Sequence, residues 1–256
     1  MTKETDKRSP LRNRPLRYAG QSLDEKIDDL IDESRTSALY PLWFVALAAF
    51  DWVRRITKAP LNPWLFTVMA LVAAGYTTFR WWRARQKLAQ LKLGRDGEKI
   101  VAENLEVLKQ HGDTVLHDVV GDSFNIDHVV LSQHGVFLIE TKTLSKPVRG
   151  NPMIAFDGHK VLVDGIEPDR DPIAQASALA KWLEQTLLAS TGKRFPVRPV
   201  VVFPGWYVEP MPKGTQTWVL NPKALPTFVQ NEPVVISDSD LHLAAFHLTR
   251  YIRTYA

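Results

Sequence analysis

Residues 124–143, FNIDHVVLSQHGVFLIETKT, decide the fold of this chain. Two runs rich in β-branched and aromatic residues, 124–131 and 136–143, flank the polar turn segment Ser-Gln-His-Gly at 132–135. Such runs around a short glycine-containing turn predict an antiparallel pair of strands. A tight turn pairs Leu131 with Val136, and the same register places Asp127 directly opposite Glu140.

Two acidic side chains are therefore expected to face each other on a largely apolar hairpin. Directly opposed side chains have Cβ atoms about 5 Å apart, and like charges at that separation are destabilising. The pair needs either a shared proton or a cation, and oxygen ligands suit Mg²⁺ or Mn²⁺. Lys142 projects from the same face as Glu140 because side chains alternate along a strand. This pattern predicts a site that hydrolyses phosphodiester bonds, although the spacing alone equally permits a surface ion-pair cluster.

The remaining sequence from Gly94 onward predicts an α/β domain over residues 94–256. Apolar residues recur at helical spacing over 96–110, and Glu98 lies on their stripe, where it could supply a third carboxylate. We expect a further sheet strand at 114–120, a hairpin at 154–163, a helix opened by Asp171-Pro172, buried strands at 197–203 and 218–220, and a closing helix that begins near Ser237. This order predicts a mixed β-sheet with helices packed on its faces.

Several short motifs, taken in order, resemble the nuclease-related domain (NERD) family over about residues 94–215. They are Gly94-x-x-Gly97-Glu98, Asn125-Ile126-Asp127-His128-Val129-Val130, Gly135-Val136-Phe137-x-Ile139-Glu140-Thr141-Lys142, Asp171-Pro172-x-x-Gln175 and Val200-Val201-Val202-Phe203. The resemblance implies a restriction-endonuclease-like PD-(D/E)xK fold. It implies that Asp127 and Glu140 are metal ligands and that Lys142 is the catalytic lysine. It also makes Glu98 the helix-borne acid and Gln175 the polar residue of the following helix.

Charge is distributed unevenly along the 256 residues. The net charge is +4, yet residues 96–256 hold fifteen basic and nineteen acidic side chains, so the basic character belongs to the first 95 residues. A chain-wide basic nucleic-acid binder is therefore not expected. The absence of cysteine excludes disulfides, thiolate zinc sites and cysteine nucleophiles. No phosphate-binding P-loop or dinucleotide-binding glycine motif occurs.

The N-terminal part predicts three further segments: a charged flexible tail at 1–35, a membrane anchor at 36–82 and a basic connector at 83–93. Within the anchor we expect spans at 38–53 and 61–80, because residues 61–79 are nineteen uncharged residues with tryptophans near both ends. A helical hairpin is favoured over a single span with the first run in the interface. The basic flanks predict a bacterial inner-membrane protein whose nuclease domain is cytoplasmic.

The leading interpretation is a membrane-anchored, Mg²⁺-dependent (or Mn²⁺-dependent) endonuclease that acts on DNA. A homodimer would allow such an enzyme to cut both strands. The alternative is a catalytically silent nucleic-acid-binding or sensor module at the membrane, which the net acidic charge of the domain favours. The presence of both carboxylates and of the lysine favours the enzyme. A membrane scaffold that binds protein is a third option without specific support.

Overall fold

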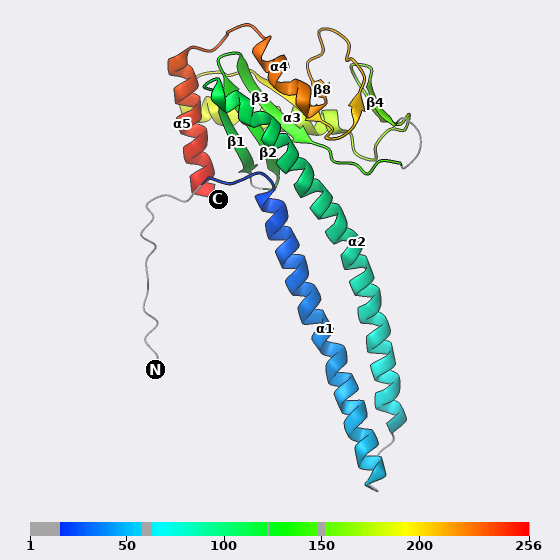
Figure 1. The fold of residues 1–256 in the computed structure, drawn as a ribbon. Coiled ribbons are helices and arrows are strands. Elements are labelled where there is room, and N and C mark those ends of the chain that lie inside the picture. The colour runs from blue at the N-terminus through cyan, green and yellow to red at the C-terminus, as the bar shows by residue number, and fades with distance from the viewer. Residues whose placement is uncertain (1–15, 58–62, 122, 148–151, 256) are drawn as a thin grey trace, which may run out of the picture. The chain divides into compact units, whose positions relative to one another are not determined.

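The structure is a computed structural model that describes residues 16–57, 63–121, 123–147 and 152–255 (Figure 1). The chain divides into two units, residues 22–93 and residues 1–21 together with 94–256. Helix α2, Pro63–Gln110, contributes its first part to the former unit and its last part to the latter. The two units are described separately below.

The unit at 22–93 consists of two helices that contact each other, α1, Gln21–Ile56, and the first part of α2. The indole Nε1 of Trp52 donates a hydrogen bond of 3.2 Å to Thr67 Oγ1, and its ring meets that of Trp64 edge-on at 6.3 Å. Further along, Arg80 forms an ion pair with Glu33. The end of α1 thus meets the beginning of α2, so the helices run antiparallel.

Among the described residues, neither helix contains a stretch that is long and apolar enough to cross a membrane. The expected spans at 38–53 and 61–80 are therefore not supported. Lack of charge is not the same as high hydropathy, because residues such as Tyr76, Thr77 and Thr78 dilute the apolar run in α2. The two threonine hydroxyls hydrogen-bond to helix carbonyls one turn earlier, at 2.9 and 2.8 Å.

The structure describes part of the expected tail and all of the expected connector. Residues 1–15 lie outside the described residues, whereas residues 16–21 belong to the unit that contains 94–256. The acidic stretch after Gln21 forms the first turns of α1, and α2 runs without a break through the expected connector at 83–93.

The other unit is built around a mixed sheet of five strands in the order β1-β2-β3-β6-β8. Strands β1, Thr114–Val120, β2, Asn125–Ser132, and β3, Gly135–Thr141, are antiparallel neighbours. Strands β6, Val197–Val202, and β8, Trp218–Leu220, continue the sheet in parallel with β3. This confirms the expected mixed sheet, and the hairpin strands lie within two residues of their predicted bounds.

A second, three-stranded sheet contains the predicted hairpin at 154–163. It consists of β4, Met153–Phe156, and β5, Val161–Val163, which are antiparallel, and of β7, Tyr207–Val208, which is parallel to β4. The sequence did not predict β7. Two residues are too few for a periodic pattern, so the pairing with β4 defines this strand.

Helices cover the large sheet. Helix α3, Pro172–Thr191, begins as predicted, because the Asp171 side chain caps it by accepting a hydrogen bond of 2.8 Å from the Ile173 N–H. Helix α5, Asp238–Tyr255, closes the domain. The short helices η1, Pro222–Ala224, and α4, Leu225–Gln230, were not predicted.

The core consists of two apolar clusters that are separated by the strands. One joins α3 and α5 to the sheet through residues such as Leu183, Leu248 and Leu138. The other joins the end of α2 and α4 to the sheet through residues such as Leu105 and Phe137. The sheet is thus flanked by helices, and its polar side chains at 127, 140 and 142 interrupt an otherwise apolar environment.

Candidate active site

The hairpin of β2 and β3 has the predicted register. Leu131 pairs with Val136, and the ladder continues in step as far as the pair His128–Ile139. Asp127 and Glu140 are the next residues in this register. The Asp127 carboxylate reaches across to β3, where its Oδ2 accepts a hydrogen bond of 2.7 Å from the Thr141 backbone N–H. The two acidic residues therefore occupy neighbouring positions on adjacent strands.

Glu140, Lys142 and Gln175 form a triangle of hydrogen bonds. Glu140 Oε1 accepts from Lys142 Nζ at 2.8 Å and from Gln175 Nε2 at 2.6 Å, and Gln175 Oε1 accepts from Lys142 Nζ at 2.8 Å. Lys142 is held in place because its backbone N–H donates to Val202 O at 2.9 Å, just beyond the end of β3. Gln175 comes from the first turn of α3, which Asp171 caps.

One oxygen of Glu140 has no hydrogen-bond partner. Its side chain is 6% exposed, and Oε2 is buried without a donor in the part of the chain that the structure describes. A buried carboxylate oxygen without a donor is costly. Burial raises the pKa of Glu140 above its ordinary value, although the Lys142 ammonium opposes this effect.

The Asp127 carboxyl is under greater electrostatic strain. Burial raises its pKa well above the ordinary value, and the nearby charges of Glu140 and Glu98 raise it further. The Thr141 N–H and the Lys142 ammonium act in the opposite direction. Three acidic groups therefore act on one small site, which favours either a proton or a cation there.

Glu98 reaches this site because Gly97 allows α2 to approach the end of β3. A Cβ atom on Gly97 would lie 1.7 Å from Thr143 Oγ1, so a larger residue does not fit there. Glu98 is buried, as the predicted apolar stripe requires, and its charge acts on Asp127. The close approach explains in physical terms why glycine stands before the acid.

The donor set fits a hard divalent cation. Among the described residues no group of three or more His, Asp and Glu side chains is arranged to hold a metal ion. Mg²⁺, however, is commonly bound by one or two carboxylates and keeps several waters. The raised pKa values of Asp127 and Glu140 and the bare Oε2 of Glu140 fit such an ion.

A partly buried histidine pair, which the sequence analysis did not predict, joins strands β1 and β2. His117 of β1 and His128 of β2 approach each other at 2.9 Å between their Nδ1 atoms. Burial lowers the pKa of His117 to about 4 and lowers that of His128 well below its ordinary value. Both rings are therefore neutral near pH 7, and one ring must donate while the other accepts. The only signal for this pair is the register of β1 and β2, which places His117 opposite His128.

The loop after Lys142 is tied to a buried tryptophan, which the sequence did not predict either. Trp206 Nε1 donates to the Leu144 carbonyl at 3.1 Å, and the Lys146 ammonium lies 5.5 Å from the centre of the indole ring. Lys146 follows Lys142 closely in the sequence, so this contact fixes a cation on the loop that leaves the acidic site.

Comparison with known proteins finds one related domain within this chain. The site and sheet describe a mixed α/β domain with an acidic, lysine-containing centre. Residues 93–204 match the nuclease-related domain family, so the chain contains a nuclease-related (NERD) domain. An uncharacterized protein of Bacillus anthracis is 37% identical over 67 residues, which is 24% of this chain and 32% of the relative. The chain thus matches about a third of that relative's length. No solved structure matches.

Proposed function

We propose that the domain is a metal-dependent nuclease that hydrolyses DNA phosphodiester bonds. The observation that carries this proposal is the buried Glu140 carboxylate, which binds Lys142 and Gln175 through one oxygen, whereas its other oxygen has no hydrogen-bond partner among the described residues. The nuclease-related domain at 93–204 supports it independently. On this proposal the mixed sheet is the core of a PD-(D/E)xK fold.

Each side chain has a proposed role. Asp127 and Glu140 would hold Mg²⁺ or Mn²⁺, which when bound supplies an activated water and offsets phosphate charge. Lys142 is proposed as the catalytic lysine, because its ammonium is held beside Glu140 and can stabilise negative charge on a phosphate. Gln175 fixes both Lys142 and Glu140. Glu98 is proposed to add negative charge that favours a cation at the site.

Plasmid cleavage by the full chain tests this proposal. Supercoiled DNA is incubated with Mg²⁺, with Mn²⁺ or with EDTA, and nicking is followed by gel electrophoresis. Glu140→Gln and Lys142→Ala should each lower the rate by about 100-fold or more. The matched control is Lys160→Ala, which removes an exposed lysine from its ion pair with Glu167. Equal cleavage by wild type, Glu140→Gln and Lys142→Ala would contradict the assignment.

The alternative function is a catalytically silent nucleic-acid-binding or sensor module. The fifteen basic and nineteen acidic residues of 96–256 are its main support. The same experiment separates the two functions when DNA binding is measured beside cleavage. Binding that needs no metal and persists in Glu140→Gln, without cleavage by any variant, would favour the alternative.

We also propose that residues 36–82 attach the chain to a membrane, with the nuclease domain on the cytoplasmic side of a bacterial inner membrane. Support comes from exposed aromatic side chains on the two helices, including Trp43, Trp64 and Trp82, and from the exposed cations Arg83 and Lys87 that follow. Tryptophan favours the membrane interface, and basic residues favour anionic headgroups. The chain should float with anionic vesicles on a density gradient. Sedimentation without the vesicles would contradict attachment.

The proposed homodimer has a separate test. Light scattering coupled to size exclusion gives the mass of the full chain, for which one copy is 29.0 kDa. A mass of one copy at the concentrations at which cleavage is measured would contradict dimer formation.

A further inference from the structure

We propose that residues 16–20 form an N-terminal latch of the nuclease-related domain and that Arg17 is a positioning residue for Asp127, acting through Asp118. The consequence for metal binding and cleavage rests on the proposed nuclease function, whereas the structural part does not. The latch precedes the helical unit at 22–93 in the chain, yet it belongs to the same unit as residues 94–256. One domain is thus built from two separated pieces of sequence.

Arg17 is the main anchor of the latch. Its Nε lies 2.6 Å from Asp118 Oδ2, and the two side chains are only 8% and 3% exposed. The neighbouring Leu16 and Tyr18 are largely exposed, although the Tyr18 ring lies near the Lys99 ammonium of α2 at 6.0 Å. Gly20 ends the latch with a φ of +79°, and a Cβ there would lie 2.9 Å from Arg95 Cγ.

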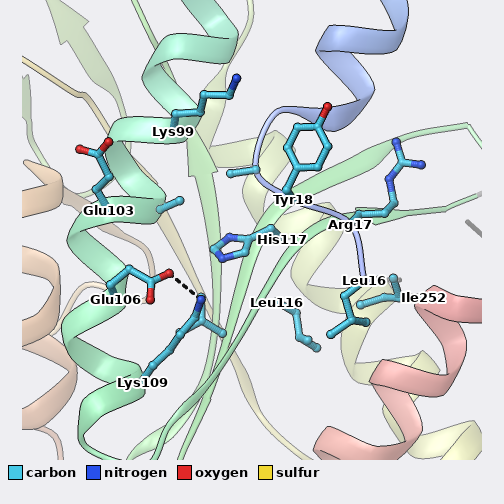
Figure 2. Close-up of a pocket in the computed structure, with 13 residues that line it drawn as sticks. Leu16, Arg17, Tyr18, Lys99, Glu103, Glu106, Lys109, Leu116, His117 and Ile252 are labelled. Atoms are coloured by element: carbon cyan, nitrogen blue, oxygen red, sulfur yellow. Dashed lines mark hydrogen bonds and ion pairs between the residues drawn. The ribbon is translucent and has the colours of Figure 1, made fainter. Parts of the chain in front are cut away.

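A cavity of about 530 Å³ lies between the latch, α2, β1 and the end of α5 (Figure 2). Its lining includes Leu16, Tyr18, His117 and Ile252, and Figure 2 shows the His117 ring lying between the latch and α2. Beside this cavity, the buried Arg17–Asp118 ion pair is a polar contact that holds the latch to β1.

Asp118 connects the latch to the acidic site. It occupies the β1 position across from Asp127 on β2, because the residue pairs immediately before and after it keep one register. Asp118 itself has a φ of +51°, a left-handed conformation that is uncommon for a residue with a side chain. This conformation interrupts the β1–β2 ladder at the level of Asp127. Asn125 Nδ2 also reaches Asp118 Oδ1, at 3.4 Å.

The ion pair holds the unusual backbone conformation in place. Left-handed backbone at such a residue persists only where its surroundings enforce it. Without Arg17 the buried Asp118 carboxylate loses a close, buried charge partner, which is unfavourable. Asp118 is then expected to turn toward water, so that the ladder rearranges and Asp127 loses its hydrogen bond from the Thr141 N–H. Arg17 thereby acts on the site without touching it.

The test compares Arg17→Ala and Arg17→Lys with wild type and with the surface control Lys160→Ala, all in the full chain. Without metal, hydrogen exchange is measured at the Thr141 amide, which donates to Asp127 Oδ2, and at the Val219 amide in β8. In Arg17→Ala the hydrogen-exchange rate of the Thr141 amide should rise at least about tenfold, while that of the Val219 amide is unchanged. Arg17→Lys keeps the charge and should give a smaller increase. Unchanged exchange at Thr141 would overturn the latch.

Metal binding provides the second readout. Mn²⁺ affinity, measured by calorimetry where Val219 exchange shows the variants folded, should fall about tenfold in Arg17→Ala and not in Lys160→Ala. Faster Thr141 exchange with unchanged Mn²⁺ affinity would overturn the positioning role and leave a merely structural contact. If wild type binds no Mn²⁺ and cuts no DNA, the proposed function fails, whereas Thr141 exchange still decides the latch. If Arg17→Ala does not fold, the double variant Arg17→Met with Asp118→Asn, which removes both charges of the buried pair, replaces it with the same expected exchange at Thr141.

Discussion

Gln175 donates a hydrogen bond of 2.6 Å to Glu140 across the interface of α3 and β3. The same amide accepts a hydrogen bond from Lys142, so one side chain orients both an acid and a base. The arrangement occupies Oε1 of Glu140, and within the described part of the chain Oε2 has no donor. A residue from another element thus makes the two oxygens of one carboxylate differ in their hydrogen bonding.

Removal of the Gln175 amide should weaken metal binding more than it weakens the fold. Gln175 is exposed on one side, so Gln175→Ala leaves no cavity in the core. Glu140 would keep only Lys142 as a partner, and its carboxylate would no longer be held in one orientation. We expect Mn²⁺ affinity to fall about tenfold by calorimetry. An unchanged affinity in Gln175→Ala would show that Lys142 alone orients Glu140.

A methyl group at position 97 should be strongly unfavourable. In Gly97→Ala the new Cβ would lie 1.7 Å from Thr143 Oγ1, and α2 must move away from the strand end. We expect a loss of about 1–3 kcal/mol in the free energy of unfolding by urea titration. The matched control is Gly75→Ala in the same helix, where no atom lies within 4 Å and where a small gain of stability is expected. An equal change in the free energy of unfolding in Gly97→Ala and Gly75→Ala would contradict the close approach of α2 to Thr143.

The stability of the domain should depend on pH through the buried histidines. The folded pKa of His117 is about 4, below the ordinary 6.5, so the unfolded chain binds more protons between these values. Stability is therefore present above pH 6.5 and is lost as pH falls toward 4. From about pH 7.5 to about pH 5, His117 should contribute a loss of roughly 2 kcal/mol.

A comparison with His117→Gln isolates this contribution. The raised pKa values of Asp127 and Glu140 act in the opposite direction, since the folded state then holds extra protons and loses stability as pH rises. The difference between wild type and His117→Gln in urea unfolding at the two pH values removes the carboxylate contribution. A difference that does not change with pH would contradict a neutral, buried His117.

Glu140→Gln should stabilise the metal-free protein while removing its response to metal. The substitution replaces a buried charge beside Asp127 with a neutral group of the same shape, so repulsion at the site decreases. Thermal unfolding in EDTA should therefore shift upward. Added Mg²⁺ should raise the melting temperature of wild type but not that of Glu140→Gln. A Mg²⁺-induced shift of equal size in both proteins would mean that the ion binds elsewhere.

Much of the fold around the site was predictable, because it depends on local rules. The turn at 132–135 sets the register, alternation places Lys142 with Glu140, and the Asp171 cap begins α3. These signals are contained in a few consecutive residues. The membrane spans predicted for the helical unit at 22–93 are not supported, because no described helix is long and apolar enough to cross a membrane. An uncharged run does not by itself have the hydropathy of a membrane span. Short elements such as β7 carried no periodic signal at all.

The sequence alone predicted the hairpin register that brings Asp127 and Glu140 to neighbouring positions, since a tight turn with one face buried specifies the register. The tertiary structure decided which hydrogen bonds and ion pairs the surrounding groups make. Gln175 arrives 35 residues after Glu140, and Arg17 reaches Asp118 from 101 residues away. Such contacts depend on how separate elements pack and on the cost of burying a charge without a partner, which no local pattern encodes. The hairpin places the acids, and long-range packing sets their orientation and their charge.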